Sequence, residues 1–153
     1  MKITDFLTLE RVIPALRGRV KDEALKEMAD ELAACDPKLN KGKVAQVLLE
    51  REKISTTAIG EGVAIPHGKL AGVQRIEGLF ARSPEGVDFA SLDGDPTYLF
   101  FVLIAPEDAV ADHLKALARI SRLLKDPAFR SRLMAGKTSE EIFNIIATED
   151  QKF

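Results

Sequence analysis

The residue in this sequence with the clearest chemical potential is a histidine that lies between a proline and a glycine. The segment is Ile65-Pro66-His67-Gly68-Lys69, in a stretch that also contains Gly60 and Gly62. The proline restricts the backbone before the histidine, and the glycine leaves the backbone after it unshielded, so another molecule has room to approach the ring. Neutral imidazole is a competent nucleophile, since its unperturbed pKa is about 6.5. From these residues alone, a nucleophilic histidine and a buried or turn-capping histidine both stay open.

Other chemistries lack the residues that they need. A zinc site needs three or four ligands at suitable spacing, whereas the chain has two histidines and one cysteine and no paired-cysteine motif. The glycines are not followed by Lys-Ser/Thr as in a phosphate loop, and no dinucleotide fingerprint is present. No nucleophile-elbow pattern surrounds Ser55, Thr56 or Thr57. We therefore expect neither a metal nor a cofactor.

Helical spacing of apolar residues predicts two helices in the first third of the chain. The first covers Lys21 to Ala34, and Asn40 can cap the second. In this second helix Arg51 lies seven positions after Val44 and therefore falls on the same, inward side. Three further helices are expected after residue 109, as their apolar spacing and end signals indicate. Asp126-Pro127 ends the first of them, Gly136 the second, and the third begins with a capping box of Thr138 and Glu141.

The middle of the chain predicts strands. The pattern predicts a short strand from Val63 to Ile65, with His67 just beyond its end. It predicts a second strand from Gln74 to Ser83, which Pro84 ends. Thr97 to Ala105 is continuously apolar, as a strand covered on both faces would be. Helices at both ends and strands between them predict an α/β fold with a mixed β-sheet flanked by helices. No linker or repeat divides the sequence, so we expect one domain over residues 1–153.

The sequence resembles the type-2 IIA domains of the bacterial phosphoenolpyruvate-dependent phosphotransferase system, the fructose/mannitol family. The resemblance extends over nearly the whole chain. It rests on Leu49-Glu50-Arg51-Glu52, Thr56-Thr57-Ala58-Ile59-Gly60, Gly62 through Gly68, Phe100 through Pro106, and His113-Leu114. Within this family the continuation Ile-Pro-His-Gly-Lys-Leu at residues 65–70 is similar to the nitrogen-regulatory branch, IIA-Ntr.

The resemblance implies that His67 accepts a phosphoryl group from a small HPr-like carrier (NPr), with Arg51 and His113 as its partners around the phosphorylated ring. A guanidinium offers a planar fork of donors for phosphate, and a helix start such as that near His113 presents free amides. Each residue also has a purely structural interpretation: Arg51 could bond the last carbonyls of its helix, and His113 could pack on the apolar face.

Three further residues are candidates for phosphate binding. The hydroxyls of Thr56 and Thr57 could donate to phosphoryl oxygens, or could equally form a turn within their loop. Gly68 is the third candidate, although Gly60, Gly62 and Gly68 are also explained as glycines that permit the backbone conformation.

Two functions follow from the resemblance. In the first, the protein is a regulator whose phosphorylation state selects its target proteins, with nitrogen and potassium-related signalling as the expectation for the branch. In the second, it is a sugar-transport component that relays phosphate to a IIB domain of a fructose/mannitol-type permease.

Composition limits the remaining classes. The net charge is −2 and the charged fraction is 30%, and basic residues are not interleaved with aromatic ones as a nucleic-acid surface would need. The N-terminus lacks a signal-peptide pattern, and the longest apolar run, Tyr98 to Ala105, is too short to span a bilayer. We therefore expect a cytoplasmic protein that neither binds nucleic acid nor inserts into a membrane.

Overall fold

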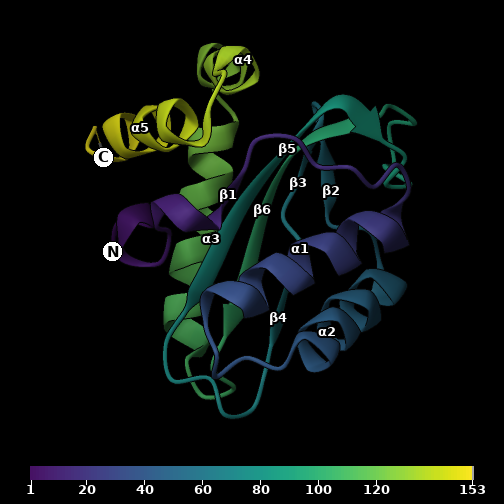
Figure 1. Cartoon of the computed structure of the whole chain (residues 1–153), viewed down its shortest axis with the longest axis vertical. Helices are drawn as coiled ribbons and strands as arrows, with labels where there is room; N and C mark the ends of the chain where they lie inside the picture. Colours follow the sequence, from purple (N-terminus) through teal and green to yellow (C-terminus); the bar gives the residue numbers. More distant parts are fainter. Residues whose placement is uncertain (153) are drawn as a thin grey trace.

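The structure is a computed structural model that describes residues 1–152, and it consists of a mixed β-sheet with helices on both faces (Figure 1). The strands are β1 (Val12–Ile13), β2 (Ala58–Gly60), β3 (Val63–Ala64), β4 (His67–Lys69), β5 (Glu77–Val87) and β6 (Thr97–Ala105). The α-helices are α1 (Lys21–Cys35), α2 (Lys41–Ile54), α3 (Val110–Leu124), α4 (Pro127–Ala135) and α5 (Ser139–Asp150). Two short 3-10 helices, Ile3–Asp5 and Leu9–Arg11, precede β1. The predicted α/β class with a mixed, helix-flanked sheet is confirmed.

The sheet is built around its two long strands. Its order is β1-β5-β6-β3-β2, and β4 also pairs with β6. The pair β5–β6 is antiparallel, whereas β1 is parallel to β5, and both β3 and β4 are parallel to β6. Since β3 pairs with the first half of β6 and β4 with the second, β3 and β4 behave as one strand that is interrupted at residues 65 and 66.

This interruption corrects the predicted strand from Val63 to Ile65. The strand ends at Ala64, and His67 opens the next strand instead of lying beyond the end of a strand. The N–H of Ile65 donates to the Thr57 carbonyl at 3.1 Å, and Pro66 has no N–H to donate. Pairing with β6 resumes where the Pro66 carbonyl accepts from the N–H of Leu103 at 3.0 Å.

The strand predicted from Gln74 to Ser83 begins and ends a few residues later in the structure, at Glu77 and Val87. β5 begins at Glu77, which pairs with Ile104, the next-to-last residue of β6, so Gln74 and Arg75 lie beyond the end of that partner strand. The strand also continues past Pro84 to Val87. The pairing register shifts between Arg82 and Val87, and a proline without an N–H is tolerated in such an irregular stretch.

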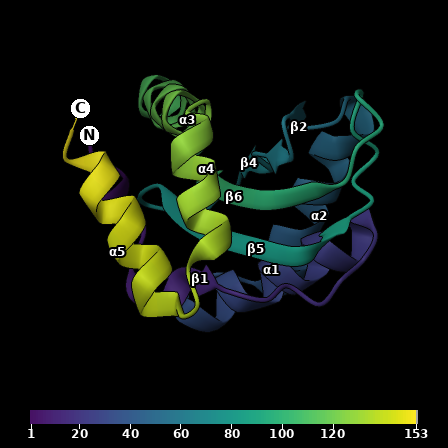
Figure 2. The ribbon, with the colours of Figure 1, turned by 90° about the horizontal axis from the view of Figure 1, so that it is seen from above.

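The strand β6 contributes side chains to both cores, as its continuous apolar sequence predicted. Phe100, Val102 and Ile104 pack in the cluster under α1 and α2, whereas Phe101 and Leu103 pack in the cluster under α3, α4 and α5. Figure 2 shows these two helix layers on opposite sides of β5 and β6. The alternation follows from the pleat of a strand, in which successive side chains point to opposite faces.

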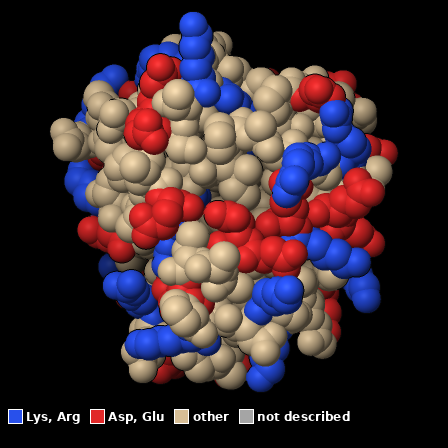
Figure 3. Space-filling model, in the orientation of Figure 1, with Lys and Arg blue, Asp and Glu red and all other residues tan. Residues whose placement is uncertain are grey.

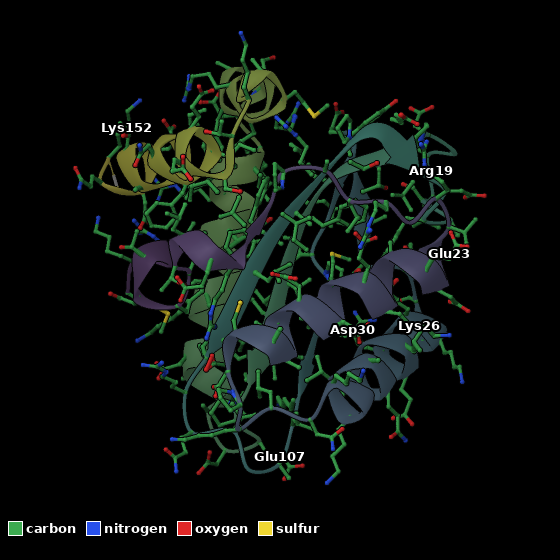
Figure 4. All side chains as sticks on the ribbon, in the orientation of Figure 1. Arg19, Glu23, Lys26, Asp30, Glu107 and Lys152 are labelled. Carbon is green, nitrogen blue, oxygen red and sulfur yellow. The ribbon has the colours of Figure 1, made fainter. Side chains whose placement is uncertain are left out.

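The helix α1 is amphipathic. Leu25 and Met28 are fully buried, whereas Glu23, Lys26 and Asp30 are exposed on its outer side (Figure 4). On the face of the molecule that carries α1, acidic and basic side chains are interspersed (Figure 3). This face therefore presents no continuous basic surface.

The predicted helix starts are confirmed, with one difference. The side chain of Asn40 accepts from the N–H of Lys43 at 3.1 Å, and that of Thr138 accepts from the N–H of Glu141 at 3.1 Å. The predicted capping box also requires the Glu141 carboxylate to bind the N–H of Thr138. It binds the N–H of Lys137 instead, at 2.7 Å, so that one half of the box is shifted by one residue.

The contact of α2 with β4 depends on the glycine at position 68. A Cβ atom at Gly68 would lie 2.2 Å from Cγ1 of Val47, so the helix packs against bare backbone. Real Cβ contacts are never this short, and Cγ1 of a valine belongs to a short side chain with little freedom to move. Position 68 therefore sets the distance between α2 and the strand that begins with His67.

We predict that Gly68→Ala lowers the free energy of unfolding by about 1–3 kcal/mol, because the added methyl group overpacks this contact. In a Val47→Ala background the same substitution should cost close to nothing, since the opposing methyl group is absent. Urea unfolding of the four proteins in a double-mutant cycle measures the difference. An equal cost of Gly68→Ala in both backgrounds would contradict this packing account.

Candidate functional site

The two histidines of the chain meet in a groove at the β4 side of the sheet. The groove has a volume of about 480 Å³ and lies between α2 and α3, with β4 at its base. Among the residues that line it are His67 and Gly68 from β4, Arg51 from α2, and His113 from α3. The structure thus brings together four of the six residues that the sequence nominated. They come from three segments that are far apart in the chain.

The ring of His67 is held by a hydrogen bond to the backbone. Its Nδ1 lies 2.8 Å from the carbonyl oxygen of Ile65. A carbonyl oxygen accepts and cannot donate, so Nδ1 carries the proton in the neutral ring and Nε2 holds the free lone pair. The ring is partly exposed, and it lines the groove. The geometry therefore leaves Nε2 as the nucleophilic nitrogen.

The electrostatic surroundings keep His67 neutral. Burial lowers the pKa of His67 below its ordinary value of 6.5, and the positive charge of Arg51 acts in the same direction. The hydrogen bond to Ile65 and the negative charge of Glu52 act against these two effects but do not outweigh them. The neutral imidazole, which is the nucleophilic form, is therefore favoured near pH 7.

The second histidine lies edge-on to the first. The ring centroids of His67 and His113 are 5.4 Å apart, with an angle of 77° between the ring planes. His113 is in the first turn of α3 and is only 6% exposed, and its Nε2 is the one buried side-chain N or O atom without a hydrogen-bond partner in residues 1–152. Burial lowers the pKa of His113 most, and electrostatic repulsion from His67 and Lys69 lowers it further. An unsatisfied buried polar atom beside His67 is available for a group that binds in the groove.

Arg51 combines the two roles that the sequence left open. Its Nη1 donates to the carbonyl of Ser55, the residue after α2, at 2.9 Å. The side chain is nevertheless partly exposed and lines the groove. A guanidinium has five N–H donors, so the bond to Ser55 leaves others for an anion.

The two threonines do not line the groove. The hydroxyl of Thr57 is buried and donates to the carboxylate of Glu52. The hydroxyl of Thr56 accepts from the N–H of Ala58 at 3.1 Å, which is the local turn considered as the alternative, and it donates to the Phe89 carbonyl at 3.4 Å. Both hydroxyls therefore have protein partners already.

The structure adds residues that reasoning from the sequence did not single out. Ile54, Val110 and Leu114 are 79%, 49% and 62% exposed around the two histidines and give the groove an apolar rim. Glu52 is buried although it is charged. A signal for Glu52 was present, because it follows Leu48 by four positions and Val44 by eight, both buried positions of α2.

The described part of the chain contains no group of three or more His, Cys, Asp or Glu side chains that could hold a metal ion. No helix among residues 1–152 combines the length and the apolar character that crossing a membrane requires.

Comparisons with known proteins show the family to which the chain belongs. Residues 5–149 match the family described as "Phosphoenolpyruvate-dependent sugar phosphotransferase system, EIIA 2". A nitrogen regulatory protein of Bradyrhizobium diazoefficiens is 49% identical over 96% of this chain and 95% of its own length. The fructose-specific EIIABC component of Bacillus subtilis is 37% identical over 99% of this chain, which corresponds to 24% of that longer protein.

A solved structure agrees with these sequence matches. The crystal structure of the nitrogen regulatory protein IIA-Ntr from Neisseria meningitidis superimposes with a TM-score of 0.87 and 33% identity, over 94% of this chain and 98% of that one. The chain therefore belongs to the type-2 IIA (EIIA 2) family of the phosphoenolpyruvate-dependent phosphotransferase system, and within that family it is similar over nearly its full length to nitrogen regulatory proteins of the IIA-Ntr kind.

Proposed function

We propose that the protein accepts a phosphoryl group on Nε2 of His67 from an HPr-like carrier and acts as a nitrogen- and potassium-related regulator through its phosphorylation state. The observation that carries this proposal is the hydrogen bond from Nδ1 of His67 to the Ile65 carbonyl, 2.8 Å long, in a groove that also contains Arg51 and His113.

The transfer requires one bond to form and one to break. The lone pair of Nε2 attacks phosphorus in line, the Nε2–P bond forms, and the N–P bond to the carrier's histidine breaks, with its electron pair returning to that ring. The Nδ1 proton of His67 stays in place and donates to Ile65. It thereby shares the positive charge that develops on the ring. The spare donors of Arg51 and the unpaired Nε2 of His113 are positioned to bind phosphoryl oxygens.

The apolar rim supports a protein as the phosphoryl donor. Ile54 and Leu114 are exposed on either side of the groove, from α2 and α3. Large apolar side chains that are exposed together at one site mark surfaces that interact with other proteins. A small carrier that presents its phosphohistidine could cover this rim while transfer proceeds.

The regulatory role is supported by the degree of similarity to the relatives. The nitrogen regulatory protein of Bradyrhizobium diazoefficiens is 49% identical, whereas the fructose-specific proteins of Bacillus subtilis and Haloferax volcanii are 37% and 31% identical. The second candidate is a IIA component of a sugar permease that relays phosphate to a IIB domain. It draws support from the 37% identity to that fructose-specific protein.

The proposed function is tested by phosphoryl transfer followed by intact-mass measurement. Incubation with phosphoenolpyruvate, enzyme I and an HPr-like carrier should add about 80 Da, the mass of one phosphoryl group that is labile to acid, to the wild-type protein and nothing to His67→Gln. A subsequent challenge with a fructose-type IIB domain separates the two candidates: a regulator keeps the group, and a relay component transfers it within seconds. Equal mass gain in His67→Gln would eliminate His67 as acceptor.

The rate of transfer should depend on pH through His67. Protonation of Nε2 removes the lone pair, so activity should be constant above the ordinary pKa of 6.5 and decline below it, with a midpoint under 6.5 because burial lowers the pKa of His67. The same shift makes the folded protein lose stability as pH falls from 6.5 through the folded pKa, because only the unfolded chain binds protons there. NMR titration of the ring measures the midpoint without the carrier. A value above 6.5 would contradict the electrostatic account.

A further inference from the structure

A buried carboxylate lies next to the site without lining it. Glu52 is 7% exposed and follows Arg51 on α2. Its Oε1 accepts from the N–H of Thr57 at 3.0 Å and lies 3.1 Å from Nζ of Lys21, and its Oε2 accepts from the Thr57 hydroxyl. The ammonium group of Lys21 also lies 4.9 Å from the centroid of the Phe89 ring. The carboxylate is thus paired and hydrogen-bonded on both oxygens.

A buried ion pair of this kind contributes little to stability, so its presence calls for an explanation other than stability. Burial of an unpaired charge strongly destabilises a fold, and replacement of a buried ion pair by apolar residues is often neutral or stabilising. Two of the three groups that Glu52 binds belong to Thr57, and both the N–H and the hydroxyl of that residue are used. The carboxylate therefore fixes the position of Thr57 in particular.

Thr57 is connected to the reactive ring by two further hydrogen bonds. Its carbonyl accepts from the N–H of Ile65 at 3.1 Å, and the carbonyl of Ile65 accepts from Nδ1 of His67 at 2.8 Å. Ile65 lies in the gap between β3 and β4, and its N–H bonds to Thr57 instead of to β6. The orientation of the carbonyl that sets the proton position on His67 consequently depends on Thr57.

We propose that Glu52 is a positioning residue for His67, acting through Thr57 and Ile65, with Lys21 holding the carboxylate in place. This inference rests on the proposed function of His67 as a phosphoryl acceptor. The continuous series of contacts from Lys21 to Nδ1 of His67 keeps the proton on Nδ1 and the lone pair on Nε2. In this series the Thr57 hydroxyl serves to bind Glu52 and not to bind phosphate.

The charge of Glu52 provides a second, independent link to the ring. Among the influences on the pKa of His67, burial is the largest and lowers it, and Glu52 is one of the two that raise it. Once Nε2 carries a phosphoryl group and Nδ1 keeps its proton, the ring is cationic, and the buried carboxylate stabilises it.

The test uses three substitutions and one control in the full-length protein. Glu52→Gln keeps the shape but removes the charge, and Thr57→Val removes the hydroxyl while Thr57→Ser retains it. Thr138→Val, which removes the hydroxyl that caps α5 on the other side of the sheet, serves as a control for a loss of stability unrelated to the site. Two properties are measured for each protein. Long-range proton–nitrogen NMR reports the tautomer of neutral His67, and single-turnover transfer from the carrier reports the rate at saturation and the carrier concentration for half-maximal rate.

We expect wild type, Thr57→Ser and Thr138→Val to show the Nδ1–H tautomer alone. Glu52→Gln and Thr57→Val should show a mixture with Nε2–H and a saturating rate lowered about tenfold or more, with the half-maximal carrier concentration unchanged within about twofold. Folded variants that keep the Nδ1–H tautomer would overturn the inference, whatever their transfer rates, and would leave Glu52 a structural residue. A wild-type protein that accepts no phosphoryl group would refute the proposed function instead, while the tautomer comparison would still decide the role of Glu52.

Discussion

One hydrogen bond organises the candidate site: Nδ1 of His67 to the carbonyl of Ile65. It exists because the strand beside β6 is interrupted at residues 65 and 66, which frees the Ile65 carbonyl from the sheet and turns it toward the ring. The long, fully buried strand β6 makes this interruption tolerable, since it pairs with β3 before the gap and with β4 after it. The bare backbone of Gly68 then lets α2 approach β4, and α2 carries Arg51 to the groove.

Local sequence signals were sufficient for most of the fold. The continuous apolar run of β6, the Asn40 cap and the proline after Asp126 each specify an element or its end through short-range chemistry. The boundaries of β5 could not be predicted, because they depend on where its partner ends and on a register shift that accommodates Pro84. The break before His67 escaped prediction for the same reason, since the N–H of Ile65 bonds to a residue eight positions away.

The candidate site was accessible from the sequence only in part. His67, Gly68, Arg51 and His113 were nominated from a motif and a family resemblance, and the structure brings them to one groove. The bond of the Thr56 hydroxyl to the Phe89 carbonyl and that of the Thr57 hydroxyl to Glu52 could not be foreseen, because a hydroxyl can donate to almost any nearby acceptor and the fold decides which acceptor is near. Glu52 stood at a buried helical position in the sequence, but its ion pair with Lys21 joins two helices that only tertiary packing brings together.

We propose that Nε2 of His67 is the phosphoryl acceptor because Nδ1 is committed to the Ile65 carbonyl. The most direct test is NMR of the carrier-phosphorylated protein with nitrogen-15 in its histidines, which identifies the nitrogen bonded to phosphorus. We expect phosphorus coupled to Nε2 of His67, with a protonated Nδ1 still hydrogen-bonded to the backbone. A phosphoryl group on Nδ1 of His67, or on His113, would contradict it.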